Sequence, residues 1–162
     1  MQCALVLAQP DKAEALGRAL AKLQRQKPDL VISPAMGGLI IGHEVARALK
    51  VRAYFTERDN GVMALRRGFA LKPGEKVVVV EDVVTTAKSS GEVIALVRSL
   101  GAEVVGILSI VNRGEKAPKL DVPCESLLRL PIASYTAEDC PLCRQGLPLV
   151  KPGSRTKPKI PC

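Results

Sequence analysis

The fold is decided by the stretch Val77-Val78-Val79-Val80-Glu81-Asp82-Val83-Val84-Thr85-Thr86-Ala87-Lys88-Ser89-Ser90. Four consecutive valines predict a strand that is buried on both faces, as in a parallel sheet. Glu81 and Asp82 then fall at its carboxyl end, where open α/β sheets bind their ligands. The hydroxyl-rich turn that follows leads into a helix, so it offers hydroxyl and backbone N–H groups to a phosphate. We therefore expect an anion site at this strand end.

Strands and helices alternate along the rest of the chain. We expect strands at residues 2–8, 30–32, 51–55, 77–80, 104–111 and 127–132, with helices starting near residues 10, 39 and 89. Residues 57–74 are polar, basic and rich in glycine, so they predict an extended loop or a hairpin. The alternation indicates an α/β domain with a parallel sheet covered by helices. At 162 residues, one domain is expected.

Composition limits the partners. The net charge of +8 favours anionic ligands, whereas the aromatic content of 2% argues against nucleic acid, because single-strand binders stack bases on rings. No apolar run reaches membrane-spanning length, and the apolar start lacks the basic leader and cleavage pattern of a signal peptide. We therefore expect a cytoplasmic protein that does not contact membranes.

Residues 77–90 resemble the phosphoribosyl-pyrophosphate (PRPP) signature of type I phosphoribosyltransferases. The chain has neither a Walker loop nor a dinucleotide-binding fingerprint. The resemblance implies an α/β fold with a central, mostly parallel five-stranded sheet flanked by helices and a small partial hood. It implies one domain over residues 1–148, whose N-terminal hood is incomplete, and a basic, proline-rich tail over residues 149–162.

The same resemblance assigns the PRPP site. Glu81 and Asp82 take the ribose hydroxyls, and Asp82 is also expected to be catalytic. The 5′-phosphate goes to the turn that follows the acids, made of Val83, Val84, Thr85, Thr86, Ala87, Lys88 and Ser89. The family often has Gly-Gly in place of Ala87-Lys88; the lysine adds a cation beside the phosphate.

Three further loops follow predicted strands and match the orotate branch of the family. Met36 and Gly37 correspond to the pyrophosphate loop. Residues 56–69 correspond to the mobile catalytic loop, with Arg58 as the first choice for a catalytic cation and Arg66 and Arg67 as its substitutes. Arg113, together with Thr85, corresponds to the residues that bind orotate, because a guanidinium can donate two parallel hydrogen bonds to a carboxylate.

The resemblance therefore implies a Mg²⁺-dependent orotate phosphoribosyltransferase. It would transfer ribosyl 5-phosphate from PRPP to orotate, giving orotidine 5′-phosphate and pyrophosphate in pyrimidine biosynthesis, and it would be a homodimer. Mg²⁺ is expected on the diphosphate and the ribose hydroxyls, with no dedicated protein metal site. Two alternatives stay open: a purine phosphoribosyltransferase, and a PRPP-binding regulatory module with little catalysis.

The cysteines leave one motif without a role. Five cysteines occur at irregular spacing, which is not a disulfide framework. Cys140 and Cys143 form a lone C-x-x-C without a second pair or a suitable histidine. A zinc site, a redox role and a disulfide all remain open for this pair.

Overall fold

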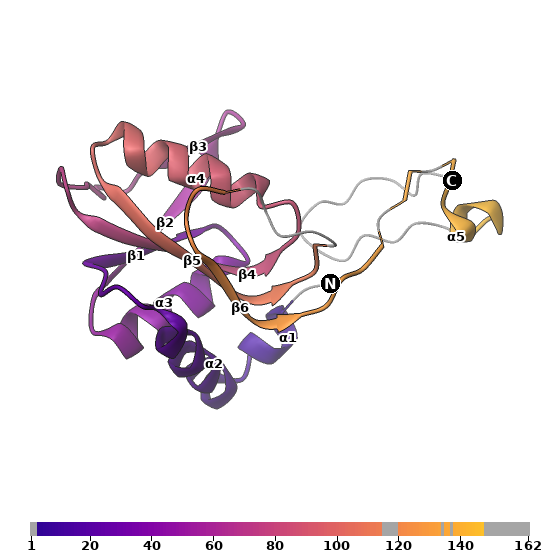
Figure 1. Ribbon diagram of the computed structural model, residues 1–162, viewed down its shortest axis with the longest axis horizontal. Helices are drawn as coiled ribbons and strands as arrows, with labels where there is room; N and C mark the ends of the chain where they lie inside the picture. Colours follow the sequence, from indigo (N-terminus) through magenta and orange to yellow (C-terminus); the bar gives the residue numbers. More distant parts are fainter. Residues whose placement is uncertain (1–2, 115–119, 134, 137, 148–162) are drawn as a thin grey trace.

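Six strands form one sheet in the computed structural model, which describes residues 3–114, 120–133, 135–136 and 138–147 (Figure 1). The strands are β1 (Leu30–Pro34), β2 (Arg52–Asp59), β3 (Val62–Leu65), β4 (Lys76–Val84), β5 (Glu103–Asn112) and β6 (Cys124–Arg129). The helices are α1 (Ala4–Leu7), α2 (Pro10–Leu23), α3 (Gly38–Leu49), α4 (Lys88–Ser99) and α5 (Pro141–Arg144).

The sheet has the order β3-β2-β1-β4-β5-β6. Strands β2, β1, β4, β5 and β6 run parallel, and β3 is antiparallel to β2. Helices α2 and α3 cover one face and α4 covers the other (Figure 1). The predicted fold class is therefore confirmed, but the expected count of five strands is wrong, because the hairpin strand β3 adds a sixth.

The core explains why β4 is uninterrupted valine. Val78 and Val80 pack in the cluster under α2 and α3, whereas Val77 and Val79 pack in the cluster under α4. All four are fully buried. Successive side chains of a strand point to opposite faces, so a strand with helices on both sides needs apolar residues at every position.

The expected strand over residues 2–8 is wrong. Residues Ala4–Leu7 form the short helix α1, in which the N–H groups of Leu7 and Ala8 donate to the carbonyls of Cys3 and Ala4 at 3.0 and 2.8 Å. Leu7 is buried while Leu5 is 78% exposed. A short apolar run does not distinguish a buried strand from a helical turn by its pattern alone.

The segment after β2 is a hairpin, one of the two expected alternatives. Asn60 and Gly61 join β2 to β3, with φ of +49° and +86°. Positive φ at both central residues is the mark of the tight type I′ turn, for which Asn-Gly is a preferred sequence. The predicted tail at residues 149–162 lies outside the described residues. Within the described part of the chain, no helix combines the length and apolarity needed to cross a membrane.

Candidate active site

The carboxyl ends of β1, β4 and β5 meet at one edge of the sheet. Ile32 pairs with Val79, and Val84 pairs with Asn112, so the three strands end within a few residues of one another in register. The loops that follow these strands carry most of the residues singled out in the sequence. The parallel register therefore brings Gly37, the acids of β4 and Arg113 to the same edge.

The turn between β4 and α4 encloses a cavity of about 220 Å³. It is lined by Glu81, Val83, Val84, Thr85, Thr86, Ala87, Lys88 and Ser89. The N–H groups in the first turn of a helix have no partners within the helix, and here they belong to α4. Hydroxyls, orphan N–H groups and the Lys88 ammonium are the donors that a phosphate needs.

Ala87 holds a backbone conformation that normally favours glycine. Its φ and ψ are +57° and +23°, in the left-handed region, and the residue is buried. For an L-residue other than glycine this conformation costs roughly 1–2 kcal/mol. The turn therefore keeps the shape that a Gly-Gly pair would permit, with alanine in the strained position.

Glu81 is a buried acid. Its side chain accepts a hydrogen bond from Ser90 Oγ at 3.0 Å, and only 9% of the residue is exposed. Burial raises the pKa of Glu81 to about 7; the Ser90 hydrogen bond opposes this rise and the Asp82 charge adds to it. Near neutral pH the site can therefore hold Glu81 either protonated or ionised.

Glu81→Gln is expected to stabilise the protein increasingly as the pH rises. The pKa of Glu81 is about 7 when folded against 4.5 ordinarily, so the folded state binds the proton more tightly. The stability contributed by Glu81 is thus present below pH 4.5, falls as the pH rises towards 7, and then levels off. Because the glutamine of the variant does not titrate, its advantage should grow by about 3 kcal/mol across this window.

Urea unfolding of both proteins at several pH values measures this difference. Ser90→Ala offers a control, because removing the hydrogen bond that lowers the pKa of folded Glu81 should raise the upper limit of the window and leave its lower limit unchanged. A difference between Glu81→Gln and the parent that stays constant with pH would contradict the raised pKa.

Asp82 faces a different loop from Glu81. A Cβ placed on Gly37 would lie 2.6 Å from Asp82 Oδ1, so glycine lets the loop between β1 and α3 lie against this carboxylate without displacing it. The peptide bond between Ala35 and Met36 in that loop is cis, and Met36 is 74% exposed. Adjacent strand residues point to opposite faces. The two acids therefore serve two loops: Glu81 lies under the α4 turn, and Asp82 lies against the Gly37 loop.

Arg113 joins the end of β5 to the turn after β4. Its Nε donates to Thr85 Oγ1 at 2.9 Å, and its backbone N–H donates to the Val84 carbonyl at 2.9 Å. The preceding Asn112 is buried and accepts the Gly114 N–H on Oδ1 at 3.0 Å, which holds the start of the loop. The expected pair of Arg113 and Thr85 is thus in direct contact.

Of the three candidate catalytic arginines, Arg58 lies in β2, and Arg66 and Arg67 directly follow β3. None of them lines the cavity of the β4–α4 turn. Arg58 donates to the Gly61 carbonyl at 2.7 Å and forms an ion pair with Glu92 of α4. Arg66 lies 3.6 Å from Asp59, and Arg67 donates twice to Glu57 at 3.1 Å. Each guanidinium is therefore neutralised by an acid in this conformation.

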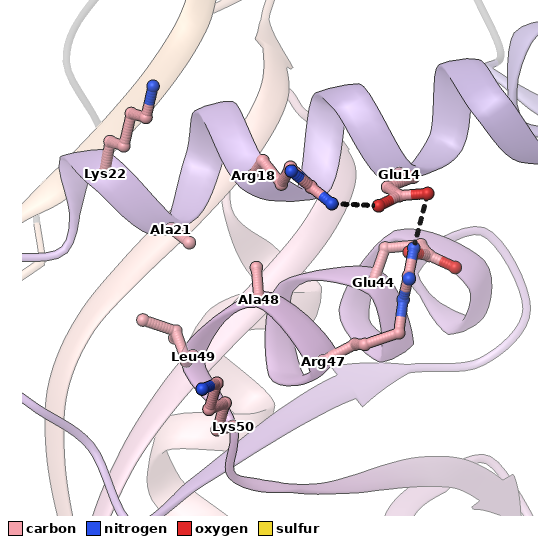
Figure 2. Close-up of a pocket in the computed structure, with 9 residues that line it drawn as sticks. All are labelled: Glu14, Arg18, Ala21, Lys22, Glu44, Arg47, Ala48, Leu49 and Lys50. Atoms are coloured by element: carbon pink, nitrogen blue, oxygen red, sulfur yellow. Dashed lines mark hydrogen bonds and ion pairs between the residues drawn. The ribbon is translucent and has the colours of Figure 1, made fainter.

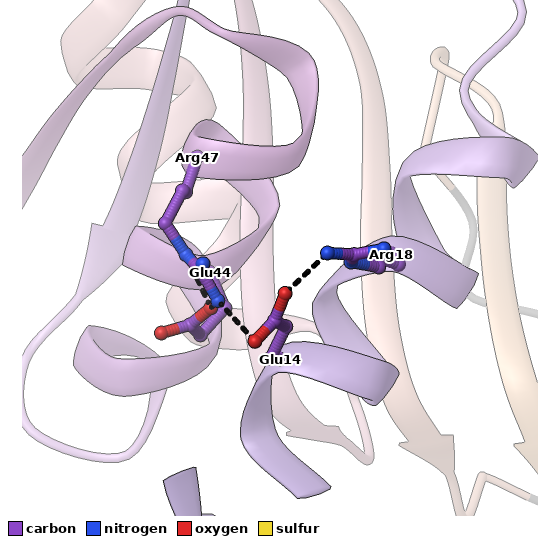
Figure 3. Close-up of polar contacts among 4 residues, drawn as sticks. All are labelled: Glu14, Arg18, Glu44 and Arg47. Carbon is purple, nitrogen blue, oxygen red and sulfur yellow. Dashed lines mark hydrogen bonds and ion pairs between the residues drawn. The ribbon is translucent and has the colours of Figure 1, made fainter. Parts of the chain in front are cut away.

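A larger cavity, of about 560 Å³, lies between α2 and α3 (Figure 2). Its lining includes an ion-pair cluster in which Glu14 accepts from Arg18 at 2.5 Å and from Arg47 at 3.2 Å, while Arg47 also reaches Glu44 (Figure 3). Both arginines are at least half exposed, so water screens these pairs. No strand contributes to the lining, so we place the chemistry at the smaller cavity.

Two contacts of the site residues were not predicted from the sequence. Ser90 is fully buried and holds Glu81, although it stands only one residue beyond the turn assigned to the phosphate. Glu92 lies on the same helix and pairs with Arg58, which is 34 residues away in sequence. The sequence places Ser90 in the first turn of a helix that follows a buried acid, so its contact with Glu81 could have been predicted. Arg58 and Glu92 are far apart in sequence, and no local pattern indicates their contact.

The mostly parallel sheet and its flanking helices have the fold of type I phosphoribosyltransferases. The phosphoribosyl transferase domain family matches residues 5–139, and the chain belongs to this family.

Among the relatives, an orotate phosphoribosyltransferase of Caldanaerobacter subterraneus subsp. tengcongensis is 53% identical, over 96% of this chain and 82% of the relative. Similar solved structures are an adenine phosphoribosyltransferase of Thermoanaerobacter pseudethanolicus and an orotate phosphoribosyltransferase of Aeropyrum pernix. The first has a TM-score of 0.67 at 25% identity, covering 77% of this chain and 84% of the other. The second has 0.65 at 26%, covering 77% and 75%.

Proposed function

We propose that this chain is an orotate phosphoribosyltransferase, which transfers ribosyl 5-phosphate from PRPP to orotate and releases pyrophosphate. The observation that carries the proposal is the contact between Arg113 and Thr85, which sets a guanidinium beside the phosphate turn. The identity of 53% to an orotate enzyme supports the choice of base. The fold alone does not decide which base is used, because the structures of an adenine and an orotate enzyme resemble this chain about equally well.

PRPP would bind across the two loops of the site. The 5′-phosphate would enter the turn of residues 83–89, and the diphosphate would meet the backbone of Met36 and Gly37. Asp82 and Glu81 would accept hydrogen bonds from the ribose hydroxyls. The contact between the Gly37 loop and Asp82 supports this arrangement, since it brings the diphosphate and ribose positions together.

The donor set fits Mg²⁺ brought in by the substrate. Among the described residues, no group of three or more His, Cys, Asp or Glu side chains is arranged to hold a metal ion. Mg²⁺ is commonly bound by one or two carboxylates together with substrate phosphates. Asp82 and Glu81 would hold it through the ribose hydroxyls. When bound, the ion would neutralise charge on the departing diphosphate.

The base would be recognised by Arg113. A planar guanidinium forms parallel hydrogen bonds with a planar carboxylate, and this carboxylate separates orotate from uracil and from the purines. Thr85 Oγ1 accepts from Arg113 Nε, which orients the guanidinium and leaves its terminal N–H groups for the ligand. Orientation of this kind places the ring nitrogen of orotate against the ribose carbon.

The hairpin would supply positive charge to the leaving group. No covalent nucleophile is needed, because the transition state resembles an oxocarbenium ion with a departing diphosphate, which positive charge stabilises. Arg58 is the first candidate and Arg66 and Arg67 are its substitutes. Their ion pairs are exposed and therefore weak, so a closing motion of the hairpin would exchange them for the diphosphate.

Arg58→Ala is expected to lower kcat about 10- to 100-fold, because it removes the cation proposed to stabilise the departing diphosphate. Glu92→Gln is the matched control: it frees Arg58 from its ion pair and keeps the guanidinium. Its kcat should stay within about threefold of the parent. Steady-state kinetics under saturating PRPP and orotate measures both values. A parent-like kcat for Arg58→Ala would remove this residue from catalysis.

The test of the function is turnover with a panel of bases. Purified protein, PRPP and Mg²⁺ are incubated separately with orotate, uracil, adenine and hypoxanthine, and nucleotide and pyrophosphate are measured. We expect pyrophosphate release with orotate and with none of the other three bases. Turnover with a purine base would make the chain a purine phosphoribosyltransferase. PRPP binding without turnover on any base would make it a regulatory module.

The protein is further proposed to act in the cytoplasm as a homodimer, without binding nucleic acid or membranes. Two apolar side chains support the dimer: Met36 and Ile40 lie four residues apart beside the site, and both are exposed. A second copy covering them would also enclose the pyrophosphate loop. The low aromatic content of 2% supports the absence of a nucleic-acid surface.

A further inference from the structure

The C-x-x-C motif lies outside the chemistry described above. Figure 1 shows α5, which carries Cys143, set apart from the sheet and its covering helices. Cys140 immediately precedes this helix, and both cysteines are partly exposed. The two sulfurs are thiols that solvent can reach, and neither lines the cavity of the β4–α4 turn.

The backbone holds the two cysteines within one helical turn. The Arg144 N–H donates to the Cys140 carbonyl at 3.1 Å, which closes the turn around both residues. Residues three apart within one turn have Cα atoms about 5 Å apart. Cys140 is the extended N-cap residue of α5, and a side-chain hydrogen bond joins it to Cys143. A disulfide needs Cα atoms roughly 4.4–6.8 Å apart. Little backbone movement therefore separates the dithiol from a disulfide.

The surroundings also distinguish Cys140 from the cysteines of the core. The backbone N–H of Cys143 is the largest cause that lowers the pKa of Cys140, and the Cys143 side chain and the Arg144 charge lower it further. Burial instead raises the pKa of Cys3 and Cys124. The thiolate is the reactive form of cysteine, so Cys140 is the reactive position of these three.

We propose that Cys140 and Cys143 form a redox-active dithiol that exchanges with low-molecular-weight disulfides such as oxidised glutathione. The Cys140 thiolate attacks one sulfur of the glutathione disulfide, breaks its S–S bond and releases one glutathione thiol. Cys143 then loses its proton, attacks the Cys140 sulfur and releases the second glutathione. Two protein thiols are oxidised to one disulfide, and one external disulfide is reduced to two thiols.

A zinc site at the same pair is the less supported alternative. Structural zinc takes four ligands, and among the described residues no cluster of three or more potential ligands includes these cysteines. Transient disulfides in reducing compartments are typically catalytic or redox-sensing, which suits a pair held outside the core.

Trypsin separates the pair from every other cysteine. Residues 130–144 form one peptide that contains Cys140 and Cys143 only, whereas Cys3, Cys124 and Cys162 fall in peptides 1–12, 120–129 and 160–162. The full-length protein is incubated with oxidised glutathione, the remaining thiols are alkylated, and the peptides are weighed. We expect peptide 130–144 to lose two hydrogens and to escape alkylation, while peptide 120–129 is alkylated in full.

Two variants test the order of the steps. Cys143→Ser should trap glutathione on Cys140 as a mixed disulfide, because the second attack cannot occur. Cys140→Ser should slow glutathione addition to peptide 130–144 at least tenfold, because the thiol whose pKa is lowered by its surroundings is absent. In the parent protein, reduced and alkylatable thiols in peptide 130–144 after incubation with oxidised glutathione would overturn the proposal. Oxidation of Cys124 at an equal rate, or thiols released only by a zinc chelator, would also overturn it.

Discussion

Arg113→Ala should raise the KM for orotate about 100-fold while the Kd for PRPP stays within about twofold of the parent. The guanidinium is positioned by Thr85 at 2.9 Å and is half-buried at the end of β5. Hydrogen bonds to a charged partner contribute roughly 1.5–3 kcal/mol each, and a hundredfold change corresponds to about 2.7 kcal/mol. Orotate titrations of initial rate give the KM, and calorimetry gives the PRPP affinity.

The neighbouring strand offers a matched control. Arg129 ends β6 and pairs in register with Asn112, so it is an arginine at the adjacent strand end, and it is exposed. Arg129→Ala should leave the KM for orotate within about threefold of the parent. Arg113→Lys should fall between the parent and Arg113→Ala, since an ammonium keeps the charge and loses the paired geometry. An unchanged KM in Arg113→Ala would exclude Arg113 from base recognition.

Asp82→Asn should weaken PRPP binding about 100-fold. The substitution keeps the size of the side chain, so the close packing against Gly37 survives while the negative charge is lost. Charge-assisted hydrogen bonds to ribose hydroxyls are roughly twice as strong as neutral ones, and Asp82 is proposed to make them. Titration calorimetry with PRPP and Mg²⁺ measures the change directly.

A surface acid serves as the control for this experiment. Asp121 pairs with Arg98 at 2.9 Å and lies just before the amino end of β6, away from the carboxyl ends of the strands, so Asp121→Asn should leave PRPP affinity unchanged. Urea midpoints of both variants should show that the fold is intact. Parent-like affinity in Asp82→Asn would mean that the ribose does not rest on this acid.

Much of the site was readable from the chain because it is local. The valine run, the two acids and the hydroxyl turn follow one another without interruption, and a parallel strand must deliver them to the ligand edge. The contact between Arg113 and Thr85 also follows from strand order, since β4 and β5 are neighbours whose ends lie in register.

The contacts that could not be predicted from the sequence depend on how side chains of different elements pack together. Alternation along β4 implies that Glu81 and Asp82 point to opposite faces, yet only the packing of α4 shows that Ser90 holds one of them in a buried site. The ion pair of Arg58 with Glu92 depends on where the hairpin crosses α4. The helix at residues 4–7 could not be predicted, because four apolar residues fit a strand and a helix equally well.

The most direct measurement is a crystal structure of the protein soaked with orotidine 5′-phosphate. We expect the phosphate in the turn of residues 83–89, the ribose hydroxyls at Glu81 and Asp82, and the base carboxylate on Arg113. Density for the nucleotide in the cavity between α2 and α3, or at any site away from the ends of β4 and β5, would contradict it.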